Sequence, residues 1–75
     1  MKIDFKPVGE PNTAVEVPPN RTLFATVEYA RTALKGQVRY SPTKAWINGT
    51  IIGRGQYNTI ITENDCVKIV EVSAW

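Results

Sequence analysis

The sequence predicts an α+β domain in which a mixed sheet of four to five strands wraps around one helix at about residues 21–35. Three observations lead to this prediction. Apolar and polar residues alternate near both ends of the chain. A stretch without glycine or proline follows a proline pair, and an Asn-Gly dipeptide joins two apolar runs. With 75 residues, the chain has room for one domain, which we assign to 1–75.

The N-terminal part of the chain predicts two short strands. Ile3 and Phe5 alternate with charged residues, which is the period of a half-buried strand. Glycine and proline in residues 9–12 predict a turn. A second strand follows at residues 15–17, and it ends at the proline pair 18–19 because proline cannot donate to a strand ladder.

The helix is predicted to follow Asn20, a residue type that often caps helix N-termini. Apolar residues recur at steps of four, three and four and form one stripe of an amphipathic helix, which Phe24 and Ala33 widen. The members of that stripe are Leu23, Val27, Ala30 and Leu34. Gly36 is predicted to cap the C-terminal end of the helix in the left-handed conformation.

The dipeptide Asn48-Gly49 gives the strongest local signal, because it favours a two-residue type I′ hairpin turn. Such a turn sets the register of its strands, so Ile47 should face Thr50, Trp46 should face Ile51, and Ala45 should face Ile52. Residues 56–61 are expected to form a loop with room for one helical turn, and residues 66–72 a final β-branched strand.

These elements make up a β-grasp (ubiquitin-like) arrangement, with a single helix covering one face of the sheet. The predicted inward residues are apolar and come from all the strands: Ile3, Phe5, Val15, Val17, Ala45, Ile47, Ile52, Val67 and Ile69. Trp46, Ile51 and Val70 should then face outward, where no second helix covers them. An exposed apolar patch of this kind often marks a partner-binding surface. The alternative is that the tails or residues 37–43 fold over it.

The composition excludes several classes of function. The chain has no histidine and one cysteine, so neither an ordinary zinc site nor a histidine general base can be built. We therefore expect no enzyme activity, catalytic residue, metal or cofactor. Cys66 is interpreted as a small strand residue. The sequence shows no signal peptide, no bilayer-spanning run and no disulfide pair, which favours a cytoplasmic location.

The net charge of +2 is too small to imply a polyanion partner. We interpret most charges as solvated faces. A lesser alternative is a single-stranded nucleic-acid-binding β-domain, because basic and aromatic residues interleave in the central part of the chain. The residues that suggest this alternative are Arg39, Tyr40, Lys44, Trp46, Arg54 and Tyr57.

Three segments in order resemble ThiS/MoaD-type sulfur carriers: residues 15–23, the hairpin of residues 45–54, and the acidic turn and last strand of residues 63–72. The resemblance implies a carrier whose terminal carboxylate is adenylated by an ATP-dependent activating enzyme and then holds sulfur for thiazole or pterin synthesis. Such carriers end in two glycines, whereas this chain has Ala74 and Trp75 there.

Two functions follow as hypotheses. The first is a ThiS/MoaD-like protein with a degenerate carrier tail that acts through protein–protein contact. Its partner would be an activating enzyme or a synthase subunit, and it would dock on Trp46, Ile51 and Val70. The second is a sulfur carrier of the thiamine or molybdopterin type, activated at its terminus at Ala74 and Trp75. Neither hypothesis involves a membrane.

Overall fold

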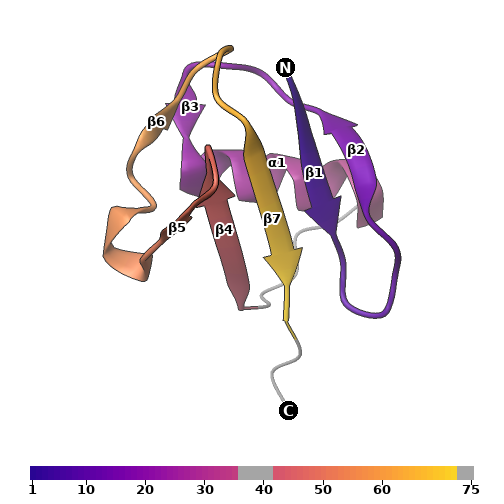
Figure 1. Cartoon of the computed structure of the whole chain (residues 1–75). Helices are drawn as coiled ribbons and strands as arrows, with labels where there is room; N and C mark the ends of the chain where they lie inside the picture. Colours follow the sequence, from indigo (N-terminus) through magenta and orange to yellow (C-terminus); the bar gives the residue numbers. More distant parts are fainter. Residues whose placement is uncertain (36–41, 73–75) are drawn as a thin grey trace.

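Five strands form one mixed sheet in the order β2-β1-β7-β4-β5 (Figure 1). The computed structural model describes residues 1–35 and 42–72. The strands are β1 (Lys2–Lys6), β2 (Thr13–Glu16), β4 (Thr43–Ile47), β5 (Thr50–Ile52) and β7 (Val67–Glu71). The helix α1 (Leu23–Lys35) separates the two hairpins along the chain.

The first and last strands lie side by side in the middle of the sheet and run parallel. All other neighbours in the sheet are antiparallel, so the N-terminal hairpin and the central hairpin flank β7. The predicted α+β class, with one helix on a mixed sheet, is confirmed for the described residues. The arrangement is compatible with a β-grasp layout.

The helix crosses one face of the sheet and encloses the core, as Figure 1 shows with α1 behind the strands. Seven of the predicted inward residues are buried, and Ile47 and Ile52 are half-buried and pack against them. The buried apolar residues of the core are Ile3, Phe5, Val15, Val17, Leu23, Val27, Ala30, Ala45, Ile61, Val67 and Ile69. The period-two pattern therefore identified the inner face correctly.

The start of the helix differs from the prediction. Asn20 is not its cap but a turn residue with φ of 63°. The cap is Thr22, whose Oγ1 accepts the Ala25 N–H at 3.1 Å. The preceding residues form β3 (Arg21–Thr22), which pairs with β6 (Ile60–Ile61) in a separate two-stranded sheet. Pairing with this distant segment removes residues 21 and 22 from the helix.

The buried side of the helix is also rotated from the predicted stripe. Leu34 is 39% exposed and Phe24 is 58% exposed, and Ala33 is exposed as well. Thr26 and Arg31 are buried in their place. The Thr26 hydroxyl donates a hydrogen bond to the Thr22 carbonyl at 2.9 Å. Because its polar group is paired in this way, Thr26 can face the core.

The central hairpin forms as predicted. Asn48 and Gly49 have φ of 53° and 83°, as a type I′ turn requires, and all three predicted residue pairs are present. The short 3₁₀ helix η1 (Arg54–Gln56) ends at the first residue of the predicted loop, and the last two residues of that loop form strand β6. Gly36 lies outside the described residues, so its predicted capping role is not located.

A buried ion pair joins α1 to β7. The Nε of Arg31 donates to Oε2 of Glu71 at 2.8 Å, and the two side chains are 7% and 0% exposed. The interpretation of most charges as solvated faces is wrong for these two residues. Glu71 follows Val67 and Ile69 at the inward positions of β7, so its carboxylate must meet a cation inside the fold.

Candidate binding surface on the open sheet face

The face of the sheet opposite α1 consists of the residues that alternate with the buried ones. We call it the outer face, and its members are Lys2, Asp4, Lys6, Ala14, Glu16, Lys44, Trp46, Ile51, Lys68 and Val70. The strand register arranges part of it in two rows. One row reads Ala14, Asp4, Lys68, Trp46, Ile51, and the other reads Lys6, Val70, Lys44.

The three residues predicted to bind a partner all lie on this face. Trp46 and Ile51 face each other across β4 and β5, and Ile51 is 57% exposed. Val70 lies in the neighbouring row, diagonal to Trp46 and between Lys6 and Lys44. Trp46 and Val70 are half-buried. The apolar residues therefore form a short stripe bordered by lysines.

Lys68 lies beside Trp46 in this stripe. Its Nζ lies 5.7 Å from the centroid of the Trp46 ring, within the range of a cation–π contact. The register places Asp4 on the other side of Lys68. The indole is thus partly covered by a flexible, charged side chain that a partner could displace or pair with.

A hollow of about 280 Å³ lies beside the indole, lined by Asp4, Trp46, Gly49, Cys66, Val67 and Lys68. Small-molecule pockets usually have volumes of about 300–1,000 Å³. This hollow lies just below that range, so it offers space for part of a partner, such as one side chain. The Cys66 thiol is free and exposed at its edge.

Hydrogen bonds fix the turn that borders the hollow. The Asn48 side chain accepts the Cys66 N–H at 2.8 Å and donates to Oδ1 of Asp65 at 3.1 Å. Oδ2 of Asp65 accepts the Thr62 N–H at 2.8 Å. Two hydrogen bonds hold the pKa of Asp65 below its ordinary value: the larger cause is the bond from the Thr62 N–H, and the next is the bond from the Asn48 side chain. Sequence analysis predicted both turns but not the link between them.

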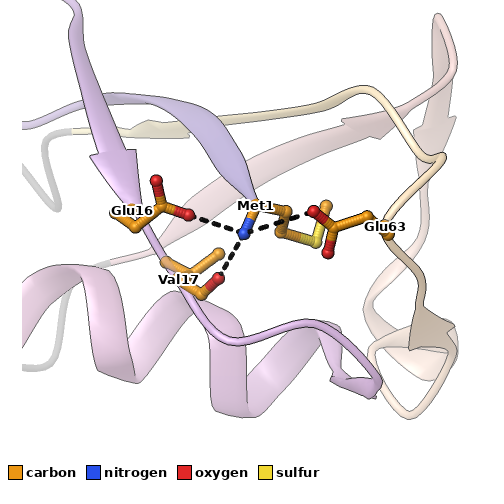
Figure 2. Close-up of polar contacts among 4 residues, drawn as sticks. All are labelled: Met1, Glu16, Val17 and Glu63. Carbon is orange, nitrogen blue, oxygen red and sulfur yellow. Dashed lines mark hydrogen bonds and ion pairs between the residues drawn. The ribbon is translucent and has the colours of Figure 1, made fainter.

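Figure 2 shows the polar contacts of the Met1 α-amino group with Glu16, Val17 and Glu63. The amino group donates to Oε2 of Glu16 at 2.6 Å and to the Val17 carbonyl at 2.8 Å, and Oε1 of Glu63 is 3.9 Å away. The hydrogen bond and the positive charge of this amino group lower the pKa of Glu16. Glu16 is therefore already paired within the chain.

We expect the Met1–Glu16 contact to make stability depend on pH in the acid range. Glu16 has a lower pKa in the folded chain than its ordinary value of 4.5, so its contribution is present above that pH and is lost as the pH falls through the lowered pKa. Thermal unfolding curves of the native chain and of Glu16→Gln should therefore converge in acid. A gap between their Tm values that stays constant below pH 4.5 would contradict this.

The described residues that suggested nucleic-acid binding do not all share one surface. Lys44 and Trp46 belong to the outer face, but the Tyr57 ring packs against the core. The Tyr57 hydroxyl lies 3.1 Å from Oγ1 of Thr43, so this tyrosine does not offer a free ring for base stacking. Arg39 and Tyr40 lie outside the described residues.

The other predicted sites have no structural description. Ala74 and Trp75, the possible carrier terminus, lie outside the described residues. Within the described part of the chain, no cluster of three or more metal-ligating side chains occurs. Nor does any described helix have the length and apolar character needed to cross a bilayer.

Comparison with protein-family models, with curated proteins and with solved structures finds no match to this chain. The function of this chain must therefore be inferred from its own residues and their arrangement.

Proposed function

We propose that this chain is a β-grasp domain of the ThiS/MoaD type. The order of its elements supports this: a hairpin, one helix, a second hairpin, and a last strand in the middle of the sheet, parallel to the first. The sequence resemblance covers the same elements. Because β-grasp domains serve many roles, the activity must be argued from the surface of this chain.

The proposed activity is docking of a protein partner on the outer face. The observation that carries the proposal is the apolar stripe of Trp46, Ile51 and Val70 on the sheet face that α1 leaves uncovered, beside the hollow. Tryptophan is enriched among residues that dominate binding energy, and an adjoining hollow supplies a place for a partner side chain. The partner fitting the resemblance is an activating enzyme or a synthase subunit.

Replacing Trp46 with aspartate should abolish partner binding. We expect a loss of at least about 2 kcal/mol in binding free energy, because the substitution removes an anchor and places a charge in the interface. The measurement is affinity capture on the immobilised chain from extracts of the source cells, with bound proteins quantified by mass spectrometry. Ile51→Glu tests the same stripe at its most exposed residue.

Tyr29→Asp is the matched control, since Tyr29 is an exposed aromatic residue on α1, away from the outer face. Amide NMR spectra of all three variants establish that the fold is kept. Proteins captured by the native chain and the control, but lost from both stripe variants, are the expected result. Equal capture by the native chain and Trp46→Asp would show that the docking surface is wrong.

The second candidate function is that of a sulfur carrier. The position of β7 favours it, because this central strand is the last element before Ala74 and Trp75, and the terminal residues follow directly from a well-anchored strand. Incubation with a ThiS/MoaD-type activating enzyme, ATP and a sulfur donor tests this role. A mass gain equal to the exchange of one oxygen for sulfur would support it, and an unchanged mass would rule it out for that enzyme.

A further inference from the structure

The outer face carries an excess of positive charge. Lys2, Lys6, Lys44 and Lys68 all extend from it, and the acids there are Asp4 and Glu16. One of these two acids is already paired, because Glu16 binds the Met1 amino group at 2.6 Å. The four lysines exceed the two carboxylates by two, so this one face carries an excess as large as the net charge of the whole chain, +2.

The lysines lie next to the apolar stripe. Lys6 and Lys44 lie on either side of Val70, and Lys68 lies beside Trp46. Strands are about 4.8 Å apart, so Lys6 and Lys44 stand about 10 Å from each other across β7. A partner that covers Val70 must approach both ammonium groups. Burying them without counter-charges would be unfavourable, whereas carboxylates on the partner would pair with them.

We propose that the partner segment bound by the outer face is acidic, with carboxylates opposite Lys6, Lys44 and Lys68 and one apolar side chain in the hollow beside Trp46. This inference rests on the proposed docking function and specifies the chemistry of the partner. The hollow of about 280 Å³ beside Trp46 is large enough to admit one apolar side chain.

Two other occupants fit the face less well. A second copy of this chain, paired symmetrically through the same face, would bring a second lysine-rich face against the first. Single-stranded nucleic acid would find the Trp46 indole for stacking, but Ile51 and Val70 give bases no aromatic platform. An acidic protein segment satisfies the cations and the aliphatic side chains together.

The test uses the ¹⁵N-labelled full chain and three short synthetic peptides. The first has one leucine flanked by glutamates, the second replaces every glutamate with glutamine, and the third replaces the leucine with serine. Amide shifts report the binding site, and the indole signal of Trp46 is identified with Trp46→Phe. We expect the first peptide to shift outer-face residues, and each altered peptide to bind at least about tenfold more weakly.

The protein side of the test uses charge reversal. The variant Lys6→Glu/Lys44→Glu should weaken binding of the first peptide by at least about tenfold. Arg21→Glu/Arg54→Glu is the matched control, because it changes the net charge equally at exposed residues of β3 and η1. The control should bind nearly as well as the native chain. Added salt should weaken the native complex, since exposed charges are screened.

The outcomes separate this inference from the proposed function. If the glutamine peptide binds as tightly as the glutamate peptide, or the lysine variant binds like its control, the acidic partner is wrong. Docking on the outer face survives in that case if Trp46→Asp still abolishes the shifts. Three other results would each overturn the inference. They are amide shifts confined to other surfaces, no shift with any peptide, and binding of oligothymidine at Trp46 that is tighter than binding of the first peptide.

Discussion

Removing either member of the buried ion pair should cost about 3–5 kcal/mol of unfolding free energy. In Glu71→Gln, the Arg31 guanidinium stays in the interior without the carboxylate that now lies 2.8 Å from its Nε. In Arg31→Met, the fully buried Glu71 carboxylate loses the same contact. The loss is large for a small domain, because total stabilities are about 5–15 kcal/mol. Chemical denaturation monitored by circular dichroism measures it.

The double variant Arg31→Met/Glu71→Leu should be less destabilised than either single variant. Apolar groups of similar volume avoid the desolvation of two charges, and such replacements are often neutral or stabilising. The single effects are therefore expected to be strongly non-additive. Arg54→Met, at an exposed position on η1, should change stability by less than about 0.5 kcal/mol. Additive losses in the double variant would mean that the pair does not act as a unit.

The parts of the fold that depend on neighbouring residues were predictable from the sequence. The Asn48-Gly49 turn determined three residue pairs, and through them the position of Trp46 opposite Ile51. Strand alternation identified the inner face because one face of the sheet is buried and the other is not. Part of the candidate site could thus be assembled before any tertiary contact was known.

The parts that depend on distant residues were not predictable in this way. Strand β3 has two residues, too few to show a period, and it exists because it pairs with residues 60 and 61. That pairing also moved the helix cap from Asn20 to Thr22. The placement of Val70 between Lys6 and Lys44 likewise requires the order β1-β7-β4, which no local pattern specifies.

The buried pair is an intermediate case, because its partners are 40 residues apart. Glu71 continues the inward alternation of Val67 and Ile69, so the pattern itself marks a carboxylate that must enter the core. The alternation along this strand does not indicate that Arg31 is the cation that pairs with Glu71. Arg31 lies four residues after the buried Val27 on α1, so it shares the buried side of the helix.

The link between the two turns at the hollow leads to the second large effect. Asn48 combines a left-handed backbone, φ 53°, with side-chain bonds to the Cys66 N–H and to Asp65. Alanine at this position would lose both bonds and would be strained at positive φ. We expect Asn48→Ala to lower the unfolding free energy by about 2–4 kcal/mol, from about 1–2 of backbone strain and the rest from the lost bonds.

Glycine at the same position separates the two causes, because it tolerates the positive φ but cannot make the side-chain bonds. Asn48→Gly should therefore lose about 1–2 kcal/mol, and less than the alanine variant. In both variants the Cys66 amide loses its acceptor. Its hydrogen exchange, measured relative to the amides of β1, should therefore be faster than in the native chain. Unchanged exchange at Cys66 would mean that Asn48 does not hold the turn. Since Gly49 and Cys66 both line the hollow, losing that link should also weaken any ligand that enters beside Trp46.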